Sequence, residues 1–139
     1  MDGYVLVAAR WVDLEFTVRA QGSAQALRRR DRTAALRARG FELRDGAEQV
    51  LEAHPALRPL LHEAAVKLRE LFGQESTFAL ERVVDPEAHE DEEPRLFLLV
   101  KTTLDADTAH ALLTQFDESW WADNAARGSH RMQVSVEFL

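Results

Sequence analysis

The stretch LRPLLHEAAVKLRELF, residues 57–72, carries the clearest structural pattern in the chain. Its apolar residues recur every three or four positions, which is the spacing of the buried stripe of an amphipathic helix. They are Leu57, Leu60, Leu61, Ala64, Ala65, Leu68, Leu71 and Phe72. Gly73 follows at once and predicts the end of the helix, because glycine readily adopts left-handed backbone angles. Pro59 falls in the predicted first turn, where its missing N–H costs little.

Three segments that follow this helix have the patterns of β-strands. Residues 77–84 are rich in β-forming residues. Residues 95–103 are apolar on both faces near the middle, which is typical of a central strand. Residues 131–138 alternate apolar and polar, which predicts one buried face and one face in water. The polar, proline-bounded segment 85–94 predicts a hairpin loop between the first two strands.

Two further helices are predicted. A short helix covers about Ala47–Ala53 and ends before the His54-Pro55 pair, since a residue before proline disfavours helical angles. A longer helix covers about 106–123, with Asp105 as its N-terminal cap. Its apolar stripe consists of Ala109, Leu112, Leu113, Phe116 and Trp120.

Residues 46–139 are therefore predicted to form a compact α+β domain, with a three- or four-stranded antiparallel sheet and two helices on one face. A fourth strand is available at 12–19, where Val12, Leu14, Phe16 and Val18 alternate with polar residues. With that strand the element order becomes β–α–β–β–α–β, which is the ferredoxin-like pattern. Residues 20–45 are rich in Arg and lack a wide apolar stripe. Residues 1–45 are thus either a strand and helix of uncertain order or an extension upstream of the true start.

Length and composition exclude several classes of protein. The chain has 139 residues, 46% of them hydrophobic, which fits one globular domain with a tail. It has no cysteine, which excludes disulfides, cysteine zinc sites, iron–sulfur clusters and a thiol nucleophile. The apolar run at 4–9 is far shorter than the roughly 20 residues that span a bilayer, and no basic region precedes it. We expect a cytoplasmic protein that does not contact membranes.

The formal net charge of −7 is unevenly distributed. Residues 1–45 carry nine Arg and six acids, a net charge of +3, and residues 46–139 carry −10. An acidic body repels phosphate, so nucleic acid is a disfavoured partner. Weak nucleic-acid binding stays an alternative through one basic cluster: Arg28, Arg29, Arg30 and Arg32. A solvated helix face explains this cluster better, because no aromatic residues are interleaved with it.

No catalytic motif is present in the sequence. It contains no G-x-G-x-x-G, no P-loop, no G-x-S-x-G and no His-x-x-x-His. We therefore predict no catalytic residue and no cofactor, and a non-enzymatic function is favoured. In the acidic loop 85–94, His89 lies among Glu87, Glu90, Asp91, Glu92 and Glu93, so a metal-assisted hydrolase is an alternative. The loop lacks the spacing and central glycine of an EF-hand, and a solvated turn is the favoured interpretation.

The hexapeptide FDESWW, Phe116–Trp121, is the candidate for function. Phe116 and Trp120 are four residues apart and continue the apolar stripe, whereas Trp121 is turned by about 100° to the edge of that stripe. Both tryptophans can simply cap the core. Alternatively they anchor a partner protein, with Asp117 and Glu118 as the polar rim, because tryptophan is enriched at interface hot spots.

The same hexapeptide belongs to a resemblance. Together with Leu68–Gly73 and Val134–Phe138, it resembles a set of small uncharacterised bacterial proteins marked by the pattern L-R-E-x-F-G … F-D-E-x-W-W … V-x-x-E-F. The likeness covers about residues 57–138 and excludes the first 45. It implies no activity, but it implies a neighbour-encoded partner, as in toxin–antitoxin pairs. The resulting hypothesis is a protein-interaction module, antitoxin-like or an accessory subunit, that binds a protein partner or forms a homodimer.

Overall fold

The computed structural model describes residue 24, residues 26–84 and residues 94–139. The chain divides into two compact units, Met1–Ala35 and Leu36–Leu139. In the first unit the described residues are helical. The predicted strand at 12–19 and most of the predicted loop, residues 85–93, lie outside the described residues.

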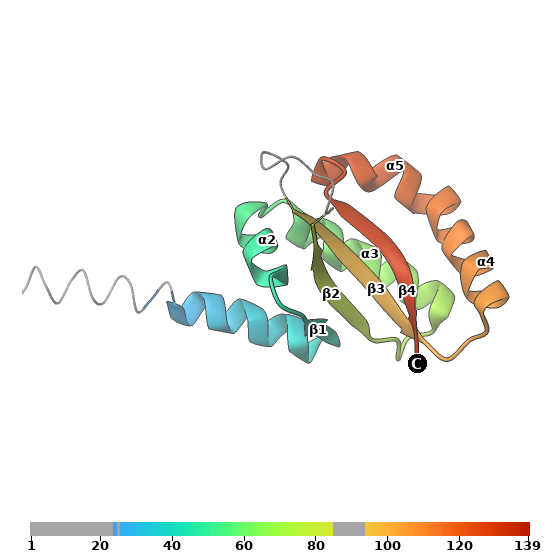
Figure 1. Cartoon of the computed structure of the whole chain (residues 1–139), viewed down its shortest axis with the longest axis horizontal. Coiled ribbons are helices and arrows are strands. Elements are labelled where there is room, and N and C mark those ends of the chain that lie inside the picture. Colours follow the sequence, from blue (N-terminus) through green and yellow to red (C-terminus); the bar gives the residue numbers. More distant parts are fainter. Residues whose placement is uncertain (1–23, 25, 85–93) are drawn as a thin grey trace, which may run out of the picture. The chain divides into compact units, whose positions relative to one another are not determined.

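The second unit contains a four-stranded sheet and its helices (Figure 1). The elements in chain order are β1 (Phe41–Leu43), α2 (Ala47–Ala53), α3 (Leu57–Phe72), β2 (Phe78–Val83), β3 (Arg95–Thr102), α4 (Ala106–Phe116), a π-helical turn (Asp117–Trp121), α5 (Ala122–Asn124), a 3-10 turn (Ala125–Gly128) and β4 (Met132–Phe138). The predicted helices at 47–53 and 57–72 are confirmed. The three predicted strands are also confirmed, with ends that differ by at most two residues.

Helix α3 forms for the reason that the sequence suggested. Six residues of its apolar stripe, from Leu57 to Leu68, are buried. The helix ends at Gly73, which has a φ of 116° and donates its backbone N–H to the carbonyl of Arg69 at 2.9 Å. A residue with a side chain rarely adopts this φ, so the glycine fixes the point at which the chain leaves the helix.

The sheet has the strand order β1-β2-β3-β4 and is mixed. Strands β1 and β2 are parallel, β2 and β3 are antiparallel, and β3 and β4 are parallel. The prediction of an antiparallel sheet is therefore wrong, although the α+β class is confirmed. The fourth strand of the observed sheet is β1 and not the predicted strand at 12–19. The physical reason lies in the connections: a helix returns the chain to the end of the sheet where the preceding strand began, so the next strand runs parallel to it.

The ferredoxin-like interpretation is also wrong. In a split β–α–β unit another strand lies between the two parallel strands. Here each parallel pair, β1 with β2 and β3 with β4, consists of direct neighbours. Strand β1 was not predicted at all, because three residues are too few to show an alternating pattern.

The core lies between one face of the sheet and the helices. It is a single cluster of buried apolar side chains from all four strands, α2, α3 and the end of α4. Half-buried side chains of β1 and β4 pack against this cluster. Its largest fully buried side chains are Phe78, Phe116, Leu36, Leu51, Leu57, Leu60, Leu61, Leu68, Leu80, Leu96, Leu98 and Val100. Three helices therefore share this face where the fold prediction counted two, and α5 extends beyond α4. In the part of the chain that the structure describes, no helix has the length and apolarity needed to cross a membrane.

Candidate interaction site

The FDESWW segment departs from the predicted regular helix. Helix α4 ends at Phe116, and Asp117–Trp121 form a π-helical turn. Its defining contact is the backbone N–H of Ala122, which donates to the carbonyl of Asp117 five residues earlier. A π-helical turn holds more residues than an α-helical turn, and such turns are frequent at functional sites.

The wider turn brings three aromatic rings together, and we call Phe116, Trp120 and Trp121 the aromatic cluster. The ring centroids of Phe116 and Trp120 are 5.8 Å apart, and those of Phe116 and Trp121 are 6.0 Å apart and stacked at 18°. The two indoles are 6.1 Å apart. Five α-helical steps would turn Trp121 away from Phe116. The wider π-helical turn instead brings the Trp121 ring back to the Phe116 ring. Trp121 is therefore not left at the edge of the stripe, as predicted from α-helical geometry.

The aromatic cluster is anchored in the core but not covered by it. Phe116 is 1% exposed, whereas Trp120 and Trp121 are half-buried and pack against the core cluster. The carbonyl of Trp120 accepts a hydrogen bond from the side chain of Asn124 at 2.7 Å. Asp117 and Glu118 are exposed. The turn thus holds two tryptophans against the core and presents two carboxylates to water.

The basic cluster lies in the first unit, where Arg28, Arg29, Arg30 and Arg32 are helical and exposed. Successive helical residues are about 100° apart, so the first three point in different directions. Arg28 and Arg32 are four residues apart and Arg29 and Arg32 are three apart, so Arg32 neighbours both of them on the helix surface. Arg30 lies about 100° beyond Arg29, so the four residues do not form one narrow basic stripe.

The acidic loop with His89 lies outside the described residues. Among the residues that the structure does describe, no group of three His, Asp or Glu side chains is placed to hold a metal ion.

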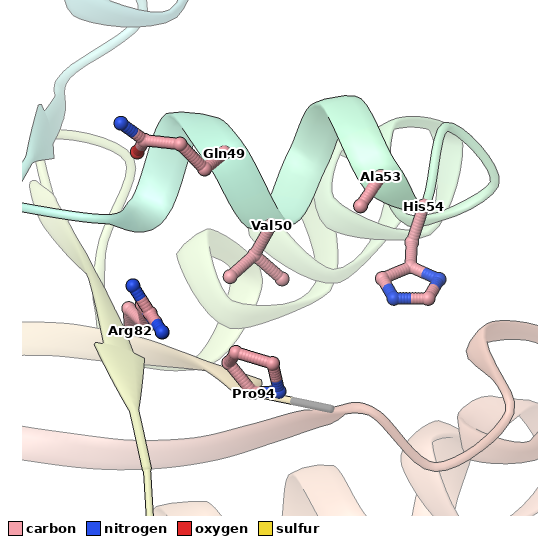
Figure 2. Close-up of a pocket in the computed structure, with 6 residues that line it drawn as sticks. All are labelled: Gln49, Val50, Ala53, His54, Arg82 and Pro94. Atoms are coloured by element: carbon pink, nitrogen blue, oxygen red, sulfur yellow. The ribbon is translucent and has the colours of Figure 1, made fainter. Parts of the chain in front are cut away.

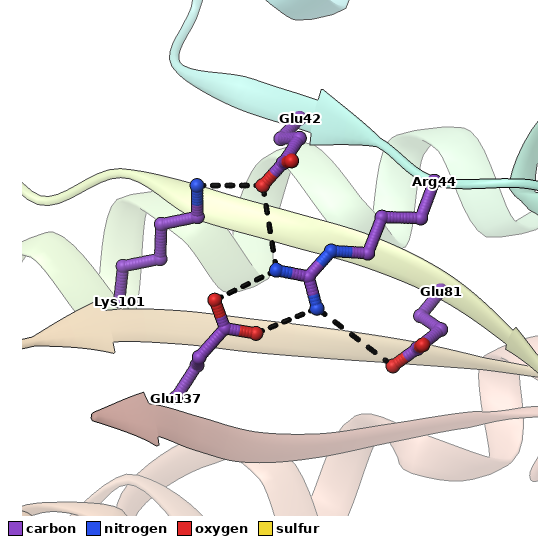
Figure 3. Close-up of polar contacts among 5 residues, drawn as sticks. All are labelled: Glu42, Arg44, Glu81, Lys101 and Glu137. Carbon is purple, nitrogen blue, oxygen red and sulfur yellow. Dashed lines mark hydrogen bonds and ion pairs between the residues drawn. The ribbon is translucent and has the colours of Figure 1, made fainter. Parts of the chain in front are cut away.

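The structure shows a polar cluster that the sequence analysis missed, on the sheet face opposite the core (Figure 3). We call its five members the charged network: Glu42, Arg44, Glu81, Lys101 and Glu137. The Arg44 guanidinium lies 2.7 and 2.6 Å from the two carboxylate oxygens of Glu137. It also lies 3.4 Å from Glu42 and 3.9 Å from Glu81. Lys101 Nζ is 2.6 Å from Glu42. Three carboxylates and two cations therefore link segments from all four strands.

Hydrogen bonds within the charged network favour the ionised forms of Glu42, Arg44 and Glu137. The hydrogen bond from Arg44 lowers the pKa of Glu137, and the same contact raises the pKa of Arg44. The hydrogen bond from Lys101 lowers the pKa of Glu42. The charged network could not be recognised from the sequence, since Arg44 and Glu137 are 93 residues apart and β1 was not predicted.

A cavity of about 340 Å³ lies beside α2 (Figure 2). It is lined by Gln49, Val50, Ala53, His54, Arg82 and Pro94. Its ionisable groups come from two elements, Arg82 from β2 and His54 from the end of α2, with apolar side chains between them (Figure 2).

No protein family, curated protein or solved structure matches this chain.

Proposed function

We propose that this chain is a non-enzymatic protein-interaction module, antitoxin-like or an accessory subunit, whose contact surface is the π-helical turn. One observation carries the proposal: two adjacent tryptophans stay half-exposed while they stack on the buried Phe116. Tryptophans fixed in this way offer a large contact area at little cost in conformational entropy, which is why they dominate interface hot spots.

The exposed carboxylates of Asp117 and Glu118 supply the rim of this surface. Charged residues at an interface rim guide encounter and select partners more than they add affinity. We therefore expect a partner with a basic rim around an apolar pocket that accepts an indole.

The test is to capture the partner with tagged full-length chain from the cells that produce it naturally, and to compare the wild type with Glu118→Arg. Charge reversal at this exposed position leaves the aromatic cluster and the fold intact. Glu75→Arg is the matched control, because Glu75 is also exposed and lies in the loop after α3. We expect E118R to weaken binding of the purified partner at least tenfold, and E75R to leave the affinity unchanged.

A second variant addresses the tryptophans directly. Trp121→Ala removes one anchor, and a loss of at least tenfold in affinity is expected for a hot-spot residue. The proposal is abandoned if no protein binds in a stoichiometric amount, or if E118R and W121A both bind it as the wild type does.

A further inference from the structure

The outer edge of β4 is the second surface that the structure leaves open. Strand β4 forms one edge of the sheet (Figure 1), and no strand of the described residues pairs with its outer side. Two hydrogen bonds at its ends show which of its backbone groups point toward β3. The carbonyl of Arg131 accepts from Leu96 N–H, and Leu139 N–H donates to the carbonyl of Thr102.

These two contacts determine the direction of every backbone group in β4. In a parallel pair, alternate residues turn both their N–H and their C=O toward the neighbouring strand. The carbonyl of Arg131 and the N–H of Leu139 point toward β3, so residues 133, 135 and 137 between them turn both groups toward β3. The N–H and C=O groups of Met132, Val134, Val136 and Phe138 point to the outer side.

The two edges of the sheet differ. Strand β1 has three residues, whereas β4 has seven in an unbroken register with β3. Short strands, prolines, bulges and lysines normally protect an edge from pairing with another chain, and β4 has none of them. Its last residue, Phe138, is 49% exposed, and the following Leu139 is 75% exposed.

We propose that β4 pairs with β4 of a second copy of this chain, antiparallel, about a two-fold axis at Ser135. In this register Val134 lies opposite Val136 of the second copy, and Met132 lies opposite its Phe138. All these residues turn their backbone groups outward, so each pair exchanges both N–H···O bonds. The pairing joins the two four-stranded sheets into one continuous sheet.

The strand is complementary to itself in this register. On the core face, apolar residues meet apolar residues, and the exposed Phe138 gains a neighbour. On the other face, Glu137 lies opposite Gln133 of the second copy, an acceptor opposite an amide donor. A register that placed Glu137 opposite Glu137 would bring like charges together, which destabilises a strand pair. The register at Ser135 avoids this and uses all seven residues.

Cross-linking tests the register. At the two-fold axis Ser135 faces Ser135 of the second copy as a non-hydrogen-bonded pair, with Cα atoms about 4.5 Å apart. This separation suits a disulfide. The chain has no cysteine, so Ser135→Cys introduces a single thiol. We expect oxidised S135C to run as a covalent dimer on a non-reducing gel.

The matched control is Gln133→Cys, on the same face of the same strand. In the proposed register the two copies of residue 133 are four positions apart along the strands, roughly 14 Å, so Q133C stays monomeric on the gel. No dimer with S135C, or equal dimer with S135C and Q133C, overturns the proposal.

A second pair of variants tests the hydrogen bonds. Val134→Pro removes an outward N–H and leaves the ladder to β3 intact, since an edge strand tolerates proline where its N–H faces away from the sheet. Val134→Ala keeps the N–H and removes the same side chain. In sedimentation over the micromolar range, we expect wild type and V134A to dimerise and V134P to stay a folded monomer. A wild-type chain that is monomeric throughout this range contradicts the proposal. If V134P does not fold, the proposal is judged by the cross-linking of S135C and Q133C alone.

This inference rests on the backbone of β4 and is independent of the aromatic cluster. E118R and W121A, which test the proposed function, are expected to leave the S135C cross-link unchanged. Each proposal can therefore fail without the other.

Discussion

The Arg44 guanidinium, just after β1, binds both carboxylate oxygens of Glu137 near the end of β4, at 2.7 and 2.6 Å. The two residues come from opposite edges of the sheet, and their contact crosses the face of β2 and β3 (Figure 3). Strand β1 pairs with β2 through only three residues. The ion pair therefore holds a short edge strand in place over and above its backbone hydrogen bonds.

Glu137→Gln is expected to lower the free energy of unfolding by at most about 1 kcal/mol at neutral pH, the upper range for a solvent-accessible ion pair. Because Arg44 lowers the pKa of Glu137 in the folded state, the stabilisation is fully present above the ordinary glutamate value of 4.5. It is lost as the pH falls through the lowered folded value. Urea unfolding of both proteins at about pH 7 and about pH 3 should show a smaller difference at the lower pH. Glu75→Gln, at an exposed position, is the control and should show none at either pH.

His62 provides a second pH dependence. Its ring is partly buried in α3, and its Nδ1 accepts a hydrogen bond from Arg39 at 3.2 Å, which requires a neutral imidazole with the proton on Nε2. Burial and the positive charges of Arg39 and Arg58 lower the pKa of His62 below 6.5. Stability is thus fully present above 6.5 and decreases as the pH falls through the folded value.

An NMR titration of the His62 ring measures this directly. The midpoint should lie below 6.5 in the wild type and rise in Arg39→Met, which removes one of the two cations. His62→Gln should remove the corresponding loss of stability at acidic pH. A midpoint at or above 6.5 in the wild type would contradict the partly buried position of the ring beside the two arginines.

Gly128→Ala is expected to destabilise the fold by about 1–3 kcal/mol, the usual cost of overpacking. A Cβ at this position would lie 2.6 Å from Leu57 Cδ2 and 3.0 Å from Leu60 Cδ2, and both leucines are completely buried. Urea denaturation gives the difference. Combining G128A with Leu57→Ala opens space for the new methyl group, so the double variant should lose less stability than the sum of the two single changes.

The turn before β4 is strained, and glycine should relieve it. Ser129 and His130 have φ values of 55° and 56°, in the left-handed region that side chains disfavour. Ser129→Gly and His130→Gly should each raise the free energy of unfolding by about 0.5 kcal/mol, after the entropy that glycine adds to the unfolded chain is subtracted. Thermal unfolding measures these changes. Ser135→Gly is the control, because a glycine in the extended strand β4 should destabilise the protein. Equal losses at all three positions would contradict the strained turn.

The sequence predicted those parts of the fold that depend on local patterns. The stripe of α3 and the stop at Gly73 give the bounds of the helix, and the alternation from Met132 to Phe138 gives β4. Strand pairing depends on how helices connect neighbouring strands, and no local pattern carries that information. The ion pair between Arg44 and Glu137 depends on this strand pairing, so local sequence patterns could not predict it either.

In the candidate site, too, local patterns predicted the residues but not their tertiary arrangement. The sequence singled out Trp120 and Trp121 by residue type, but it placed Trp121 by the α-helical step of about 100°. The extra residue in the π-helical turn is a tertiary effect: both indoles pack against the core when the turn widens.

A double-mutant cycle tests that packing. Phe116→Leu and Trp121→Leu should each destabilise the protein, and their coupling energy should be about 1 kcal/mol, as for stacked aromatic pairs. An α-helical step would turn Trp121 away from Phe116, and the coupling would then be close to zero. Phe138 serves as the control partner, because it contacts His110 near the start of α4, more than two helical turns before Trp121. The coupling energy between Trp121 and Phe138 should be negligible. If the coupling energy between Trp121 and Phe116 is no larger than this control value, the stacked cluster is ruled out.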